Sequence, residues 1–203
     1  FLNAGPRFGG SCFQKDILHL VYLCRHFGLP EVADYWESVV ALNTWQQHRI
    51  ARLVVEKLFG TVTGKRLAVL GFAFKADTND TREAPAIRIC RDLLEEGAQL
   101  AIHDPKVAAE QMARDLQQEA APQADALSGT GSWAQASSVE SAVKGADAVL
   151  VLTEWQQYRE LDWTSLASQM RKPAWVFDAR AVTDPDQVRS AGLTLWRVGD
   201  GEG

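Results

Sequence analysis

The sequence predicts an α/β protein in which a long bridging helix is followed by a doubly wound, mostly parallel sheet. Two observations lead to this class. Before residue 60 the apolar side chains recur at helical spacing, and after residue 64 short apolar strands alternate with amphipathic helices. Such alternation is typical of a parallel sheet with helical crossovers. A chain of 203 residues has room for one or two domains. We therefore expect a helical region over residues 1–60 and a sheet domain over residues 61–203.

Two helices are predicted in the first region. One runs from Cys12 to about residue 27 and ends at a glycine that is followed closely by Pro30. The other runs from Glu31 to about Phe59 and carries too many apolar side chains for one narrow stripe. We expect this long helix to be buried on more than one side. It would bridge domains, form a subunit interface or lie in the core of one domain, and these alternatives stay open.

The sheet domain is predicted to contain five strands, over residues 66–71, 99–103, 146–153, 174–178 and 193–198. Helices are expected over residues 82–96, 105–118, 139–144 and 163–170, with Asp80 and Glu83 as a cap pair for the first. Residues 120–132 are rich in Ala, Ser and Gly and predict a surface loop. In such sheets ligands bind beyond the carboxyl ends of the strands, so a site is expected in the loops after Leu70, Leu152 and Phe177.

The decapeptide at residues 7–16, Arg-Phe-Gly-Gly-Ser-Cys-Phe-Gln-Lys-Asp, predicts a catalytic cysteine. Ser11 and Gln14 have the spacing of a capping box, which would put Cys12 at the first helical position. There the helix dipole and the cation of Lys15 favour a thiolate. Asp16 lies one helical turn beyond Cys12, close enough to orient a water or hold a proton. The alternative is an inert, buried cysteine in a glycine turn.

The loop after the first strand, residues 71–83, predicts an anion site. Four of its side chains would place donors and cations around a helix N-terminus, which suits a phosphate or pyrophosphate; they are Lys75, Thr78, Thr81 and Arg82. A solvated polar loop is the alternative. The chain contains no G-x-G-x-x-G fingerprint, so its residues alone do not predict a dinucleotide site. His103 and Asp104, at the end of the next strand, are expected to serve a loop or capping role.

Composition excludes several classes of function. A net charge of -5 argues against nucleic acid or an anionic membrane surface as a partner, and no apolar run is long enough to cross a bilayer. Three cysteines without a C-x-x-C pair argue against a disulfide framework or a structural zinc site and favour the cytoplasm. The histidines lack metal-ligand spacing, so no metal is expected. Because the sequence begins at Phe1 and enters the cysteine motif at once, we expect a C-terminal fragment.

Several motifs occur in an order that resembles one enzyme family. They are residues 1–4 with 8–16, residues 71–83, Asp104-Pro-Lys106, Thr153-Glu-Trp155 and Phe177-Asp-Ala-Arg180. In that order they resemble the C-terminal portion of the UDP-glucose/GDP-mannose dehydrogenase family, on its UDP-glucose 6-dehydrogenase branch. The resemblance covers essentially the whole chain. It implies a Rossmann-like UDP-binding domain and an enzyme that uses two NAD⁺ and one water to oxidise UDP-glucose twice at C6, giving UDP-glucuronate.

The resemblance also implies roles for individual residues. Cys12 would be the nucleophile that forms a thiohemiacetal and then a thioester, and Asp16 the carboxylate that helps to activate the hydrolytic water. Lys15 and Arg82 would contact NAD. Residues that would line the UDP-sugar are Phe1, Leu2, Asn3, Phe8, Gly9, Phe74, Lys75 and Arg180. The long helix from Glu31 would bridge domains and form a homodimer or a higher homo-oligomer.

Two departures from the family pattern bear on activity. Arg7 stands where the family usually has glycine, which either alters the approach to the sugar or marks a permissive position. The N-terminal NAD-binding domain of the family is absent from this chain, so the fragment alone is expected to be inactive.

Other functions remain open. One alternative is a dehydrogenase of another nucleotide sugar, either GDP-mannose or a UDP-N-acetylhexosamine. Another is a non-catalytic module that binds nucleotide sugars or forms dimers. A cysteine hydrolase would need a histidine near Cys12, and the sequence assigns no histidine to that role.

Overall fold

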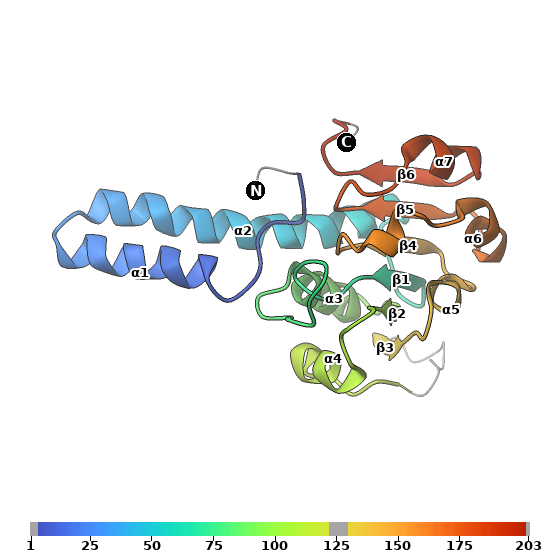
Figure 1. Cartoon of the computed structure of the whole chain (residues 1–203), viewed down its shortest axis with the longest axis horizontal. Coiled ribbons are helices and arrows are strands. Elements are labelled where there is room, and N and C mark those ends of the chain that lie inside the picture. Colours follow the sequence, from blue (N-terminus) through green and yellow to red (C-terminus); the bar gives the residue numbers. More distant parts are fainter. Residues whose placement is uncertain (1–3, 122–129, 202–203) are drawn as a thin grey trace.

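The computed structural model describes residues 4–121 and 130–201 and confirms the α/β class. Its sheet has six parallel strands in the order β3-β2-β1-β4-β5-β6 (Figure 1). The strands are β1 Arg66–Leu70, β2 Gln99–His103, β3 Ser132–Gln135, β4 Ala148–Val151, β5 Trp175–Asp178 and β6 Thr194–Arg197. The helices are α1 Phe13–His26, α2 Pro30–Lys57, α3 Pro85–Glu95, α4 Ala109–Leu116, α5 Val139–Val143, α6 Trp163–Gln169 and α7 Pro185–Ser190, and a short 3₁₀ turn covers Gln156–Tyr158.

The strand order reverses between β1 and β4, which lie side by side at the centre of the sheet with Val69 opposite Leu150. Both strands are buried on both faces, since α2, α3 and α4 cover one face and α5, α6 and α7 the other (Figure 1). The loops that follow β1, β4 and β5 therefore meet at one edge. A reversal of this kind is where ligands bind in doubly wound sheets.

The two N-terminal helices form a hairpin that extends away from the sheet (Figure 1). A small apolar cluster of Ile17, Val21, Cys24 and Ala33 holds α1 against α2. The later part of α2 joins the main core through Ile50 and Val54. Near the tip of the hairpin, Tyr35 and other apolar side chains are exposed. The expectation that the long helix is buried on more than one side is therefore wrong for the single chain.

Two elements of the sheet domain were not predicted. The sheet has a sixth strand, β3, which contributes only one fully buried side chain, Trp133. Helix α7 was also missed, although Asp184 caps it by accepting hydrogen bonds from the N–H groups of Asp186 and Gln187. An aspartate followed by proline is a recognised helix start. The predicted surface loop at residues 120–132 falls mostly on 122–129, which lie outside the described residues.

Two predicted helices begin later than expected. The helix predicted from Arg82 begins at Pro85, because Glu83 adopts a φ of 53° and cannot be helical. Asp80 and Glu83 do not cap it; its N-cap is Ala84, without a side-chain hydrogen bond. The helix predicted from Pro105 begins at Ala109, because Asp104 holds the preceding N–H groups in a turn.

Candidate active site at the carboxyl edge of the sheet

The segment that leads to Cys12, residues 4–10, runs along the carboxyl edge of the sheet. The N–H of Gly10 donates to the carbonyl of Arg82 at 2.8 Å. A Cβ on Gly9 would lie 2.5 Å from the carbonyl oxygen of Glu83, so only glycine fits there. A Cβ on Gly5 would lie 3.7 Å from Nη1 of Arg180. The cysteine segment is thus fixed against the loops that follow β1 and β5.

Asn43 of α2 holds the same segment from the other side. The N–H of Phe8 donates to Oδ1 of Asn43 at 3.2 Å, and Nδ2 of Asn43 donates to the carbonyl of Phe8 at 3.3 Å. Asn43 is only 2% exposed. A buried polar side chain in the middle of a helix needs such partners, so this one anchors the backbone four residues before the cysteine.

Cys12 is the only one of the three cysteines that is exposed, while Cys24 and Cys90 are buried. It is the N-cap of α1, one position earlier than predicted, and no side chain caps this helix. The predicted capping box is therefore wrong: Ser11 precedes the N-cap, and its Oγ lies 3.8 Å from the Cys12 sulfur. The N–H of Asp16 donates to the carbonyl of Cys12 at 2.9 Å, which sets Asp16 one turn away as predicted.

The first part of the loop after β1 is shaped by Asp104, which follows β2 and is 6% exposed. Its Oδ2 accepts from the N–H groups of Phe72 at 2.7 Å and Ala73 at 3.0 Å. The same oxygen accepts from Nε1 of Trp155 at 3.2 Å. Oδ1 accepts from the backbone of Lys106 and Val107. One buried carboxylate thus joins the loops after β1, β2 and β4.

Arg180, which follows β5, joins the loops after β1 and β4 in a similar way. Its Nη2 donates to the carbonyl of Phe74 and its Nε to that of Leu152, both at 2.9 Å. Its Nε also lies 3.2 Å from a carboxylate oxygen of Glu154. Burial lowers the pKa of Arg180, and the Glu154 carboxylate opposes that shift. Two of its three guanidinium nitrogens are thereby engaged with protein atoms.

Arg82 is held by an acidic neighbour in its own loop. Asp80 accepts from Nη2 of Arg82 at 2.7 Å and from its Nε at 2.9 Å. These bonds lower the pKa of Asp80 and raise the pKa of Arg82, and the charge of ionised Cys12 raises the pKa of Arg82 further. The Arg82 side chain is 68% exposed. Its guanidinium is therefore oriented by the protein while it remains open to a ligand.

Phe74 and Lys75 lie at the top of the same loop. A Cβ on Gly10, whose φ is 83°, would lie 3.1 Å from the ring of Phe74, so this ring packs directly on the cysteine segment. The ammonium of Lys75 lies 5.4 Å from the centre of the Phe74 ring. Lys75 is exposed. An aromatic face and an exposed ammonium therefore stand close to the glycines that precede Cys12.

The sheet does not fit a complete dinucleotide. In a dinucleotide-binding sheet the N–H groups of the first turn bind the pyrophosphate. Here those of Phe72 and Ala73 already donate to Asp104. Arg82 and Lys15 are exposed, so they fit a contact with one side of NAD, but they do not form a complete NAD site. In the described ranges no group of His, Cys, Asp and Glu could hold a metal ion.

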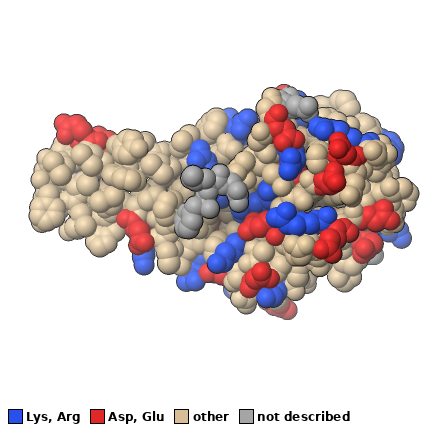
Figure 2. All heavy atoms as spheres, turned by 45° about the horizontal axis from the view of Figure 1, so that its top comes forward, with Lys and Arg blue, Asp and Glu red and all other residues tan. Residues whose placement is uncertain are grey.

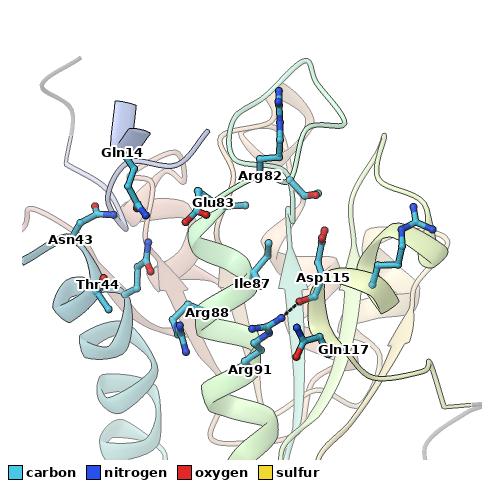
Figure 3. Close-up of a pocket in the computed structure, with 14 residues that line it drawn as sticks. Gln14, Asn43, Thr44, Arg82, Glu83, Ile87, Arg88, Arg91, Asp115 and Gln117 are labelled. Carbon is cyan, nitrogen blue, oxygen red and sulfur yellow. Dashed lines mark hydrogen bonds between the residues drawn. The ribbon is translucent and has the colours of Figure 1, made fainter. Parts of the chain in front are cut away.

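A cavity of about 490 Å³ lies beside this site, between α2, α3 and α4 (Figure 3). Arg82 borders it but points away from Arg91 and Asp115, which lie deeper along α3 and α4 (Figure 3). Arg91 donates to the carbonyl of Asp115, and Arg114 donates to Gln111. The arginines of the cavity are thus spread over its walls, several with protein partners, and do not converge on one point.

The structure brings most of the predicted site residues to one edge. Phe74, Lys75, Arg82 and Arg180 surround the segment that carries Phe8, Gly9 and Cys12, and Lys15 and Asp16 follow on α1. Phe1, Leu2 and Asn3 lie outside the described residues. Asn43, Asp80 and Asp104 were not predicted as parts of the site. No described helix is both long and apolar enough to span a bilayer.

Comparison with protein families matched two models. Residues 68–185 match the UDP-binding domain of the UDP-glucose/GDP-mannose dehydrogenase family, and residues 1–45 match the central domain of the same family. Both matches agree with the order of motifs along the chain.

Similar whole proteins carry related names. UDP-glucose 6-dehydrogenase 5 of Oryza sativa subsp. japonica is 47% identical over 206 residues, which is 98% of this chain and 43% of that protein. UDP-glucose 6-dehydrogenase 3 of Arabidopsis thaliana is 44% identical with the same coverage. A UDP-glucose dehydrogenase from the archaeon Pyrobaculum islandicum has a solved structure with a TM-score of 0.69 and 28% identity, over 95% of this chain and 38% of that one. The chain thus spans less than half the length of these relatives.

Proposed function

Because the chain belongs to the UDP-glucose/GDP-mannose dehydrogenase family, we propose that it is the part of an NAD-dependent UDP-glucose 6-dehydrogenase that carries the nucleophile and binds the sugar nucleotide. One observation carries the proposal: the only exposed cysteine, Cys12, follows a segment that contacts Phe74, Arg82 and Arg180 at the carboxyl edge of the UDP-binding sheet. The whole protein would convert UDP-glucose to UDP-glucuronate.

The nucleotide sugar would lie along the loops after β1 and β5. The exposed ammonium of Lys75 and the remaining nitrogen of Arg180 would neutralise the diphosphate. The backbone at Phe8 and Gly9 would line the sugar, because glycine allows close approach there. Phe1, Leu2 and Asn3 remain predictions for the same surface.

The covalent chemistry would take place on the Cys12 sulfur. NAD⁺, when bound, supplies the hydride acceptor for both oxidations. Loss of a hydride from C6 and of the proton of its hydroxyl would give an aldehyde. The thiolate would add to this aldehyde, forming a C–S bond while the carbonyl oxygen takes a proton, to give a thiohemiacetal. Loss of a second hydride from C6, together with the proton of that hydroxyl, leaves a thioester. Water then attacks that carbonyl, the C–S bond breaks, C6 leaves as a carboxylate and the sulfur returns as a thiolate.

The neighbours of Cys12 would support these steps. Asp16 stands one turn away and is exposed, so its carboxylate would take a proton from the attacking water. Lys15 and Arg82 would contact NAD from one side. Most of the NAD site would be formed by parts of the family protein that this chain does not cover.

The exposed apolar side chains of the α1–α2 hairpin support a homodimer or a higher homo-oligomer. Figure 2 shows few charges on this end of the molecule and many over the sheet. The large exposed apolar side chains on the hairpin are Phe13, Leu18, Leu20, Tyr22, Leu23, Phe27, Leu29, Val32, Tyr35, Leu42 and Trp45. A patch of this kind marks an interaction surface. We propose that a second copy covers it. The cytoplasmic location remains a prediction that rests on the cysteine content.

A panel of nucleotide sugars tests the substrate. NADH formation by the whole protein would be followed with UDP-glucose, GDP-mannose and a UDP-N-acetylhexosamine at equal concentrations. We expect UDP-glucose to be preferred. Robust turnover of another sugar nucleotide without turnover of UDP-glucose would assign the protein to another branch of the family. Binding of UDP without oxidation of any of them would support a non-catalytic module.

A further inference from the structure

Arg7 has an unusual backbone for an arginine. Its φ is 96°, inside the region that glycine adopts freely and that costs energy for a residue with a Cβ. The chain has glycine at nearby positions 5, 9 and 10 but not here. A backbone conformation of high energy points to a function of the residue, because an interaction made by its side chain can offset the energy cost.

The position of Arg7 is set by anchors on both sides. On one side, a Cβ on Gly5 would lie 3.7 Å from Nη1 of Arg180. On the other, Phe8 is held by Asn43, and a Cβ on Gly9 would lie 3.1 Å from the Cβ of Phe74. Arg180 donates to the carbonyl of Phe74 at 2.9 Å, so the two anchors share one contact. Arg7 therefore lies between a contact with Arg180 on one side and a contact with Phe74 on the other. Both of these residues are proposed to bind the nucleotide sugar.

The charge of Arg7 has no assigned partner. In the described ranges, 4–121 and 130–201, no hydrogen bond or ion pair of its guanidinium is observed, and the residue is half-buried. Two carboxylates of the surrounding loops are already engaged, Asp80 with Arg82 and Glu154 with Arg180. A half-buried guanidinium without such a partner favours an anionic ligand.

We propose that Arg7 binds the diphosphate of the nucleotide sugar. Guanidinium is suited to this role because its planar N–H groups match two phosphate oxygens. The inference rests on the proposed function for its ligand class. Arg7 would thus act as a third cation on the diphosphate, with Lys75 and Arg180, and the free energy of that contact would offset the backbone strain.

The test compares three variants of the whole protein by calorimetric titration with UDP and with uridine, which lacks phosphate. Arg7→Gly removes the cation and relieves the backbone. Arg7→Lys keeps a charge without the planar fork. Phe59→Gly is the matched control, since Phe59 also has a positive φ, 66°, but follows α2 on the exposed surface.

We expect Arg7→Gly to weaken UDP binding about tenfold, leave uridine binding unchanged and melt no lower than the parent. Arg7→Lys should lose less UDP affinity than Arg7→Gly, and Phe59→Gly should lose none. Equal UDP affinity in the parent and in Arg7→Gly would overturn the proposal. So would equal losses for UDP and uridine, because they would indicate a displaced loop and not a lost phosphate contact.

The same measurements separate this inference from the proposed function. If the parent binds UDP through Arg7 but oxidises no UDP-glucose, the phosphate contact stands and the dehydrogenase proposal fails. If the parent oxidises UDP-glucose and Arg7→Gly has the same KM, the dehydrogenase proposal stands and this inference fails. A parent that binds no UDP overturns the Arg7 contact directly.

Discussion

The carboxamide of Asn43 pairs with the backbone of Phe8 through two hydrogen bonds, one accepted at 3.2 Å and one donated at 3.3 Å. Through this pair, helix α2 fixes the segment that carries Cys12. Because α2 also packs into the main core, the position of Cys12 is tied to the sheet domain.

Asn43→Asp should lower the free energy of unfolding by about 1–3 kcal/mol, because a buried carboxylate cannot donate to the carbonyl of Phe8. The same variant should raise the KM for UDP-glucose as the segment moves. Gln46→Glu on the same helix is the control, since the Glu oxygen can still accept from Arg49. Urea unfolding and steady-state kinetics measure both effects. An Asn43→Asp protein as stable as the parent would show that the pair does not hold the segment.

Asp104→Asn should loosen the loop after β1. All five groups that donate hydrogen bonds to this carboxylate are N–H groups. In the Asn variant an NH2 group replaces one carboxylate oxygen, so that N–H donors would face one another without an acceptor. We expect a loss of about 1–3 kcal/mol in stability and faster amide hydrogen exchange at Phe72 and Ala73. Asp147→Asn is the control, because Asp147 accepts from the N–H of Arg66 at the other edge of the sheet. Exchange at Phe72 that is equal in both variants would contradict the role given to Asp104.

His103 should make the protein less stable in mild acid. Burial lowers the pKa of His103 from its ordinary value of 6.5, although the charge of Asp104 opposes this. The unfolded chain therefore takes up a proton first, so stability is complete above pH 6.5 and is lost as the pH falls through the pKa of the folded form.

His103→Gln should lose less stability than the parent between pH 7 and pH 5, roughly the range in which histidine titrates. His26→Gln, at an exposed position on α1, should behave like the parent. Urea unfolding at three pH values in this range measures the difference. Identical pH dependence in His103→Gln and the parent would contradict the assignment.

Lys75→Ala should raise the KM for UDP-glucose with little change in kcat, because the ammonium would contact the diphosphate in both the ground state and the transition state. Lys65→Ala is a control at the amino edge of the sheet, where Lys65 donates to the carbonyl of Thr61. Initial-rate kinetics separate KM from kcat. A Lys75→Ala protein with unchanged KM would remove this residue from the substrate site.

Local patterns in the sequence predicted the class of the fold and the helix that begins next to Cys12, while the chemistry of Cys12 stays a prediction. Five strands could be predicted because each is a short apolar run, and Asp16 was placed correctly because its relation to Cys12 is one helical turn. The capping box failed because residues outside the motif set the local backbone. Gly10 is bonded to Arg82 and has a φ of 83°, and α1 begins one residue later than the motif implied.

Contacts between distant residues could not be predicted in this way. Asn43 and Phe8 are 35 positions apart, and Asp104 and Phe72 are 32 apart. A buried Asn in a helix or an Asp after a strand has many possible partners until the fold is known. Arg7 shows the converse: the departure from glycine is visible in the sequence, but its meaning depends on a φ that only the structure gives.

The stoichiometry of NADH formation tests the central proposal most directly. The whole protein and its Cys12→Ser variant would each be given a limiting amount of UDP-glucose with excess NAD⁺, and NADH and sugar products would be counted at completion. The parent should form two NADH and one UDP-glucuronate per UDP-glucose, while Cys12→Ser should form no UDP-glucuronate, since a serine hydroxyl is a far weaker nucleophile than a thiolate and does not form the covalent hemiacetal from which the second oxidation starts. Undiminished double oxidation by Cys12→Ser would contradict the role of Cys12.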